Sequence, residues 1–370
     1  MVFSVHQLYT ELLQTLLQTL LSRRDATICA QKRPWGSTLS EVEQPKEREN
    51  STANNQDIPI KKKPSLLKRL LPWVITLACF AFLYTRMAGP AAAQGLSVAA
   101  YLGAVFASVN WAAWLAFMIP YSLFFFVIDS LVVWRVTNWF NAKVSYVDIL
   151  PVRASTYILS IINEQLGKGA MALYLNRREG VPGWKLGSSM LFIMVCELLY
   201  LCAWANIGLA LQWDNLPEVF HALPWVGITI VALFALAFLY FKSIILPNWK
   251  FRDRQIMHTF REAKLFQYLT ILLFRSPALL AAVVVYSEAL SLFGVEISYL
   301  QMLGILPVIF FGASIPGPFR AVAVSMWVIL FPEYPAEMSA FGLVQHNFFI
   351  LFNAVIGLVF LRRVQKELFS

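Results

Sequence analysis

From residue 64 onward, long apolar runs alternate with short polar connections. Runs of roughly 20 apolar residues are long enough for a helix to cross a bilayer. We place such runs near 66–84, 110–134, 187–212, 223–246, 265–288 and 336–361. Two further segments, 149–185 and 298–331, are apolar but interrupted by glycine, proline and polar residues. Helices satisfy every backbone group inside lipid, and these runs are too long for barrel strands. The pattern therefore predicts an all-α, polytopic helical membrane protein with about six full spans and two broken or re-entrant hairpins.

Residues 1–63 have a different pattern. Leucines repeat there at helical spacing with Gln and Thr opposite, at Leu8, Leu12, Leu13, Leu16, Leu17, Leu20 and Leu21. This predicts an amphipathic helix that is too polar to span a bilayer. The stretch from Ser22 to Ile60 is polar and charged, which is typical of a disordered linker. We therefore expect a cytoplasmic helix and linker over 1–63 and a transmembrane domain over 64–370.

Composition agrees with the membrane class. Hydrophobic residues make up 58% of the chain and charged residues 14%, and the mean hydropathy is +0.61. The four cysteines show no CxxC or metal-ligand spacing, and the four histidines are scattered. No metal site or cofactor is predicted.

The distribution of basic residues predicts the topology, because cytoplasmic connections of membrane proteins are rich in Lys and Arg. With the amino terminus in the cytoplasm, the basic residues on that side are Lys61, Lys62, Lys63, Lys68, Arg69, Arg135, Lys143, Arg177, Arg178, Lys185, Lys250, Arg252, Arg254, Arg261, Lys264, Arg362, Arg363 and Lys366. Only Arg86 would face outward. We expect both termini in the cytoplasm and a location in the cytoplasmic (inner) membrane. The net charge of +9 then favours anionic inner-leaflet lipids, and nucleic-acid binding is not expected.

This topology makes each interrupted segment enter and leave on one side. Segment 149–185 returns to the cytoplasm, and we expect its turn near Gly167 and Gly169 in "IINEQLGKGA". Segment 298–331 enters from outside and is broken at "SIPGPFR", 314–320. Two broken hairpins entering from opposite faces suggest an inverted repeat.

Charged groups inside the apolar runs need a partner, water or a ligand, because a charge at mid-depth costs a few kcal/mol or more. The cations there are Arg153, Lys168, Arg275 and Arg320, with Lys242 close enough to the cytoplasmic face to snorkel, and the acids are Asp129, Glu164 and Glu197. Free backbone N–H groups at the breaks would favour an anion. The candidate substrate-binding residues are Asn163, Glu164, Gly167, Lys168, Gly169, Arg275, Pro316, Gly317 and Arg320. No catalytic residue is predicted.

Structural explanations compete with this site. Glu164 and Lys168 are four residues apart and could neutralise each other on one helix. Arg275 precedes Pro277, whose kink would free a carbonyl partner. Glu197 is expected to pair with one of the cations. The polar residues of the last span are expected to form interhelical hydrogen bonds; they are Gln345, His346, Asn347 and Asn353.

Two stretches carry a resemblance to a known family. They are "RASTYILSIINEQLGKGAMALYLNRREGVP", 153–182, and the stretch from "SIPGPFR" through the last span to "LRR". The chain resembles the lysylphosphatidylglycerol synthase transmembrane family of flippase-like integral membrane proteins over roughly 66–363. The positions that match are Asn163, Gly167, Gly169, Arg177, Pro316 and Gly317. Gln165 and Leu166 stand where the family usually has Pro-Gly, and an acidic residue expected after the second Pro-Gly is replaced by the run 320–323.

The resemblance implies a lipid substrate. We expect a transporter that moves an anionic lipid or lipid-linked precursor between leaflets. One alternative is a non-transporting subunit that recruits a lipid- or glycan-modifying membrane enzyme, and another is a small-solute or ion transporter. Lipid aminoacylation is not expected, because the family's soluble aminoacyl-transferring domain has no counterpart. No constellation of nucleophile, base and orienting group predicts an enzyme.

Overall fold

The computed structural model describes residues 66–161, 164–216, 218–313 and 320–369. The chain divides into two units, Met1–Lys62 and Lys63–Ser370. The helix and linker predicted over 1–63 lie outside the described residues, as do Asn163, Pro316 and Gly317, and the side chains of Glu164 and Lys168 are not described either.

The described residues form α-helices joined by short connections and contain no strand, which confirms the all-α prediction. The helices are α2 (Leu66–Ala93), α3 (Val98–Ser108), α4 (Trp111–Phe140), α5 (Tyr146–Ser160), α6 (Glu164–Glu179), α7 (Gly183–Leu211), α8 (Leu223–Phe241), α9 (His258–Glu262), α10 (Leu265–Ser291), α11 (Tyr299–Ala313), α12 (Ala321–Leu330) and α13 (Pro335–Phe369). Short 3-10 turns occupy Trp213–Asn215, Glu218–Ala222, Lys250–Asp253 and Gln255–Met257.

Six of these helices are long and apolar enough to cross a membrane. Their apolar stretches are Trp73–Ala93, Trp111–Phe140, Gly183–Leu211, Phe220–Phe241, Leu265–Ser291 and Pro335–Leu361. Each one overlaps a predicted span, and the chain is therefore an integral membrane protein. The first was predicted to end near residue 84, which is wrong, because the helix continues past Arg86 to Ala93. The short helix α3 was not predicted; its N-cap is Ser97, whose side chain accepts a hydrogen bond from the Ala100 N–H.

The two interrupted segments are helical hairpins, as predicted. In the first, α5 and α6 lie side by side, and Arg178 Nη2 near the end of α6 lies 3.2 Å from Asp148 Oδ2 at the start of α5. In the second, α11 and α12 contact each other, and residues 314–319 between them lie outside the described residues. The Arg320 guanidinium donates a hydrogen bond to the carbonyl oxygen of Ala313, the last residue of α11.

The turn of the first hairpin was predicted near Gly167 and Gly169, and this is wrong. Helix α6 begins at Glu164, so both glycines lie inside the helix, and neither has a positive φ. Gly167 instead allows α5 and α6 to approach closely. A Cβ at Gly167 would overlap Ser160 Oγ and lie 2.9 Å from the Thr156 carbonyl oxygen, whereas a Cβ at Gly169 would meet nothing within 4 Å.

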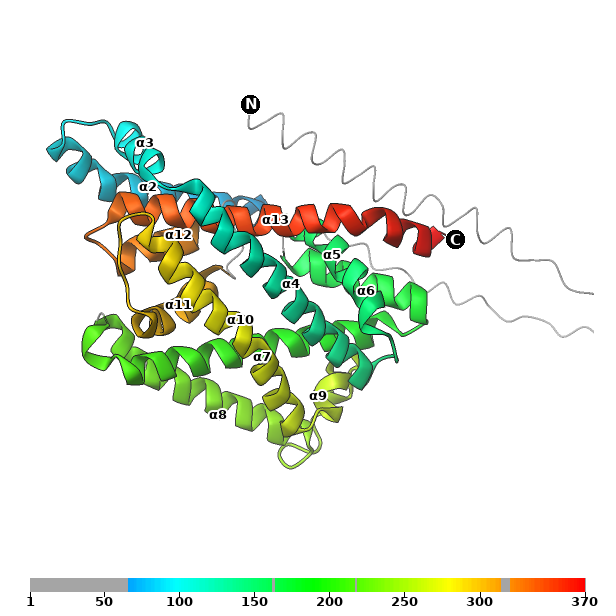
Figure 1. Cartoon of the computed structure of the whole chain (residues 1–370). Helices are drawn as coiled ribbons and strands as arrows, with labels where there is room; N and C mark the ends of the chain where they lie inside the picture. Colours follow the sequence, from blue (N-terminus) through cyan, green and yellow to red (C-terminus); the bar gives the residue numbers. More distant parts are fainter. Residues whose placement is uncertain (1–65, 162–163, 217, 314–319, 370) are drawn as a thin grey trace, which may run out of the picture. The chain divides into compact units, whose positions relative to one another are not determined.

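The helices form two halves with the same order: a long helix, a hairpin and a second long helix. The first half is α4 to α7 and the second is α10 to α13. Between α4 and α10 the chain crosses the bundle twice, through α7 and α8, so α4 and α10 run in opposite directions. Figure 1 shows α4 and α10 side by side between α13 and α7. Each hairpin packs on the other half, because α5 contacts α13 and α11 contacts α7. The same order of elements in two halves that start with antiparallel helices is what an inverted repeat would produce.

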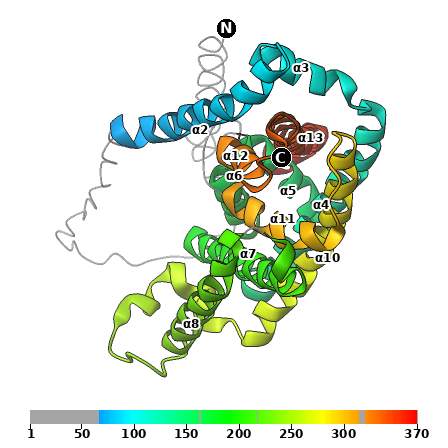
Figure 2. The ribbon, with the colours of Figure 1, turned by 90° about the vertical axis from the view of Figure 1, so that its left-hand side faces the viewer.

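Glycines permit the close packing in both halves. A Cβ at Gly208 of α7 would overlap the backbone of Gly304 in α11, and a Cβ at Gly357 of α13 would lie 2.5 Å from the Ala154 carbonyl oxygen in α5. Small residues let transmembrane helices approach in this way. The remaining long helices are peripheral: α8 packs along α7 and exposes most of its apolar surface, and Figure 2 shows it at the edge of the bundle.

Connections that should share one side of the membrane are joined at one end of the bundle. Asn141 after α4 donates a hydrogen bond from Nδ2 to Ser189 Oγ near the start of α7, at 2.7 Å. The Thr259 N–H in α9 donates to Ser188 Oγ at 2.9 Å. At the other end, the Trp111 and Phe293 rings lie 6.0 Å apart. These contacts agree with the prediction that successive connections lie at alternate ends of the bundle. The assignment of one end to the cytoplasm stays a prediction from the loop charges.

Candidate functional site

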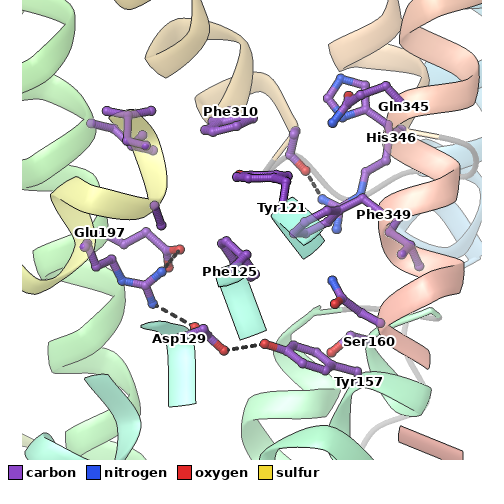
Figure 3. A pocket seen from close by; sticks show the side chains of 18 of the residues that line it. Tyr121, Phe125, Asp129, Tyr157, Ser160, Glu197, Phe310, Gln345, His346 and Phe349 are labelled. Carbon is purple, nitrogen blue, oxygen red and sulfur yellow. Dashed lines mark hydrogen bonds and ion pairs between the residues drawn. The ribbon is translucent and has the colours of Figure 1, made fainter. Parts of the chain in front are cut away.

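A cavity of about 160 Å³ lies between the two halves. Its lining comes from the long helices α4, α7, α10 and α13 and from the inner ends of both hairpins, including Ser160 of α5 and Arg320 before α12. Figure 3 shows Asp129 and Tyr157 joined on one side of this cavity, Glu197 on another, and Gln345 and His346 across from it. We name this space the central cavity.

A buried carboxylate organises one wall of the central cavity. Asp129 Oδ2 on α4 accepts hydrogen bonds from Arg153 Nε at 2.5 Å and from the Tyr157 hydroxyl at 2.6 Å. Asp129 Oδ1 accepts a third from Arg275 Nη2 on α10, at 3.2 Å. Arg153 and Tyr157 are four residues apart on α5, so both side chains face the same carboxylate. The cluster joins three helices and holds two guanidinium groups around one acid.

Arg275 also contacts a second acid. Its Nη1 lies 3.3 Å from Glu197 Oε1, near the middle of α7. The expectation that Glu197 pairs with an intramembrane cation is confirmed. The two acids differ in access: the Asp129 side chain is 3% exposed, and the Glu197 side chain is 26% exposed. Arg275 therefore links a fully buried carboxylate to one that reaches the cavity.

Arg320 is held in an unusual backbone conformation. It is the residue before α12 and has φ 51° and ψ 35°, in the left-handed region. For a residue with a side chain this conformation is strained by of order 1–3 kcal/mol, and such strain clusters at functional sites. The side chain donates to the Ala313 carbonyl oxygen and lines the central cavity. Within the described part of the chain, no carboxylate forms an ion pair with Arg320.

Uncharged polar groups from α13 complete the lining. Gln345 Nε2 donates to the Tyr286 hydroxyl on α10, and Trp327 Nε1 on α12 donates to His346 Nε2 at 3.3 Å. An indole N–H can only donate, so His346 Nε2 is an acceptor and the ring is neutral in this arrangement. The predicted interhelical hydrogen bonds are confirmed for Gln345 and His346.

The other two polar residues of α13 behave differently. Asn347 donates to the Leu343 carbonyl oxygen of its own helix at 2.7 Å, so its predicted interhelical bond is wrong. Asn353 lines the central cavity, and among the described residues its buried Oδ1 has no hydrogen-bond partner.

The predicted site residues are only partly brought together. Arg275 and Arg320, from the second half, both line the central cavity. Gly167 packs on Ser160, which lines it, whereas Gly169 lies on an exposed part of α6. Asp129, Arg153 and Glu197 were expected as intramembrane charges but not as site residues. Tyr157 and Ser160 were not predicted, although Tyr157 lies one turn after Arg153, and this spacing is the signal that could have identified it.

The chemistry of the lining favours an anion. Three arginines, at positions 153, 275 and 320, stand against the carboxylates of Asp129 and Glu197, so the described lining carries one positive charge in excess. Apolar and aromatic side chains adjoin these charges, among them Phe125, Phe310 and Phe349. A ligand with an anionic group beside apolar parts would fit both surfaces. No protein-family model, curated protein or solved structure matches the chain.

Proposed function

We propose that this protein is a flippase-like transporter that moves an anionic lipid or lipid-linked precursor between the leaflets, with the central cavity as its headgroup site. One observation carries the proposal: a cavity whose described lining holds the arginines Arg153, Arg275 and Arg320 lies between the two halves, at the inner ends of both hairpins. Transporters built from inverted repeats bind their substrates near mid-membrane at the repeat interface, often where helices are broken.

The cost of the buried charges supports a role in binding. Burying an ion costs several kcal/mol unless its partners compensate. Asp129 and Glu197 compensate two of the three arginines. Arg320 adds a third cation from a strained backbone position. A headgroup anion would supply a counter-charge for Arg320, which has no acid partner among the described residues, and the neighbouring aromatic side chains would accept the apolar part of an amphiphile.

The lipid class rests on the family resemblance. Stretches 153–182 and 314–363 resemble flippase-like proteins, and the central cavity supplies only a preference for an anion with apolar neighbours. The proposal therefore needs a direct test of lipid movement.

That test uses purified full-length protein in liposomes containing phosphatidylglycerol with a fluorophore on its acyl chain, with an impermeant quencher outside. We expect protected fluorescence to fall faster than in empty liposomes. A hydrogen bond to a charged group is worth about 1.5–3 kcal/mol, so Arg320→Gln should slow the movement about tenfold or more. Arg320→Lys should retain part of the rate. Arg86→Gln is the matched control, because Arg86 is exposed and lies outside the cavity.

Absence of accelerated lipid movement by folded wild-type protein would contradict the proposal. Uptake of a water-soluble anion by the same liposomes would replace it with a small-solute transporter, and stable capture of a membrane enzyme without transport would replace it with a recruiting subunit.

A further inference from the structure

The connection between α8 and α10 begins and ends at one surface of the membrane. It covers residues 242–264 and contains two 3-10 turns, Lys250–Asp253 and Gln255–Met257, followed by α9. The apolar stretches on either side, Phe220–Phe241 and Leu265–Ser291, are each long enough to cross the hydrocarbon core. The connection therefore leaves the bilayer and re-enters it at the same surface, and its residues lie at or near the lipid headgroups.

Hydrogen bonds fold this connection back onto the end of α8. The Tyr240 hydroxyl donates to the Trp249 carbonyl oxygen and accepts from the Arg252 N–H, both at 2.9 Å. Lys242 Nζ donates to the Arg261 carbonyl oxygen at 2.7 Å. The Arg261 guanidinium donates in turn to the Arg252 carbonyl oxygen. These contacts from several points of the connection give it a defined shape and fix which of its side chains are exposed.

The exposed part of the connection combines apolar and basic side chains. Trp249 and Phe251 are 61% and 37% exposed, and their rings lie 6.3 Å apart. The Arg254 guanidinium lies over the Phe251 ring, 5.1 Å from its centroid. Together with an exposed lysine and two exposed aliphatic residues they form what we name the interfacial patch: Ile244, Leu246, Trp249, Lys250, Phe251 and Arg254.

The acids of the connection do not neutralise the two cations of the interfacial patch. Asp253 Oδ1 lies 3.8 Å from Arg252 Nε, and Glu262 Oε1 lies 2.9 Å from His258 Nε2. In the part of the chain that the structure describes, no carboxylate forms an ion pair with either cation of the patch. Both cations are therefore available to an external anion.

Water alone is a poor environment for this combination of side chains. Large apolar groups gain free energy when they leave water, and Trp side chains favour the headgroup level of a bilayer. Lys and Arg close to a membrane surface attract anionic lipids. The bilayer that begins at both ends of the connection offers an apolar and an anionic environment together.

We propose that the interfacial patch is a binding site for anionic phospholipids of the leaflet at this end of the bundle. Its aromatic and aliphatic side chains insert at the boundary between headgroups and acyl chains, and Lys250 and Arg254 contact lipid phosphates. None of the patch residues lines the central cavity. The inference therefore does not depend on the proposed transport, and the bound lipids are distinct from a transported molecule.

The test uses full-length protein with a fluorophore on Ile244→Cys, after the native cysteines are replaced, in liposomes of phosphatidylglycerol and phosphatidylcholine in equal parts. A spin label near the carboxyl end of the acyl chain is carried by the first lipid in one preparation and by the second in the other. Quenching of the fluorophore reports which lipid lies beside the patch. We expect stronger quenching by phosphatidylglycerol, because each basic residue near the surface raises the attraction for an anionic lipid about fivefold. Added salt should reduce this preference.

Variants separate the patch from the general charge of the protein. Replacing both patch cations, by Lys250→Gln with Arg254→Gln, should remove most of the preference for phosphatidylglycerol. The matched control is Lys143→Gln with Arg177→Gln, which removes the same charge from two exposed residues outside the patch and should keep the preference. Trp249→Ala should reduce quenching by both lipids, because the patch loses an apolar group that holds it near the acyl chains.

An unchanged preference in the variant without the patch cations would overturn the inference, as would an equal loss in the control variant. A fluorophore that neither lipid quenches would also overturn it and would place the patch in water or under a protein partner. Each of these results leaves the transporter proposal standing, because the patch lies outside the central cavity. Arg320→Gln, which tests that proposal, should leave the quenching preference at the wild-type level.

Discussion

At the scale of single residues, the central cavity depends on the placement of a few charges. Asp129 is central to this cluster, because both Arg153 and Arg275 form ion pairs with its carboxylate. Burying two guanidinium groups within an apolar bundle would cost several kcal/mol each without a partner. The Tyr157 hydroxyl donates to the same carboxylate at 2.6 Å. Asp129 thus pairs with two cations, the second of which also pairs with Glu197, and holds α4, α5 and α10 together.

The first prediction is that Asp129→Asn destabilises the protein strongly. An Asn side chain has the same shape but leaves both guanidinium groups without their shared charge, and breaking a buried pair costs about 3–5 kcal/mol. The melting temperature in detergent should fall by many degrees, whereas Asp214→Asn, at an exposed residue between α7 and α8, should change it little. Equal melting temperatures for the two variants would show that Asp129 is not the group that compensates the arginines.

Only some of these residues could be assigned to the site from the sequence, for a physical reason. A charge inside an apolar run is visible in one dimension, so Arg275 and Arg320 could be assigned to the site from their positions alone. Which acid compensates which cation depends on helix packing, and Asp129 and Arg275 are far apart in the chain. Tyr157 and Ser160 are ordinary residues of an apolar helix until the fold places them beside the cavity.

At the scale of elements, the hairpins are where the glycines matter. The run "IINEQLGKGA" combines two glycines with polar residues, which favoured a turn at the glycines. The structure instead continues α6 back to Glu164 and uses Gly167 as a contact surface for α5. Sequence patterns predicted that the hairpin exists, because the segment leaves and re-enters basic connections. They could not distinguish a glycine needed for a turn from one needed for close packing.

The second prediction compares Gly167→Ala with Gly169→Ala. The added methyl group at Gly167 would overlap Ser160 Oγ and press on the Thr156 carbonyl oxygen. Overpacking of this kind costs about 1–3 kcal/mol. At Gly169 the methyl group meets open space, and the better helix propensity of Ala should leave stability unchanged or raise it by up to about 1 kcal/mol. Measured side by side, the melting temperature should therefore fall for Gly167→Ala and stay the same or rise for Gly169→Ala.

A matching loss of stability in both variants would contradict the assignment of Gly167 to the α5–α6 contact. A second outcome is also informative: a stable Gly167→Ala variant with impaired lipid movement would mean that the hairpin tolerates the methyl group and that the contact matters for transport instead.

At the scale of the whole transmembrane domain, the inverted arrangement joins features that are distant in the sequence. Each hairpin packs on the second long helix of the opposite half, through Gly208 and Gly304 in one case and Gly357 and Ala154 in the other. The antiparallel course of α4 and α10 places the two hairpins at opposite faces. The loop charges predicted that the hairpins enter from opposite faces, because each membrane crossing changes the side of the next connection. That each hairpin packs on the other half could not be predicted without the fold.

The third prediction concerns the orientation of this domain. Connections at one end carry Arg252, Arg254 and Arg261, and the connection between α7 and α8 at the other end carries Asp214 and Glu218. Because basic connections stay in the cytoplasm, Arg254 should lie inside the cell and Glu218 outside. The second hairpin, in which Arg320 precedes α12, would then enter from the outer face, and the first would enter from the cytoplasm.

Single cysteines can test this in intact cells after the native Cys29, Cys79, Cys196 and Cys202 are replaced by serine or alanine. Glu218→Cys should react with a membrane-impermeant maleimide, because its side chain is exposed. Arg254→Cys is equally exposed, yet it should react only after the membrane is permeabilised. Labelling of Arg254→Cys in intact cells, with protection of Glu218→Cys, would reverse the orientation. The helices and the central cavity would be unaffected, but the Arg320 hairpin would then face the cytoplasm, and a headgroup arriving from the inner leaflet would meet Arg320 first.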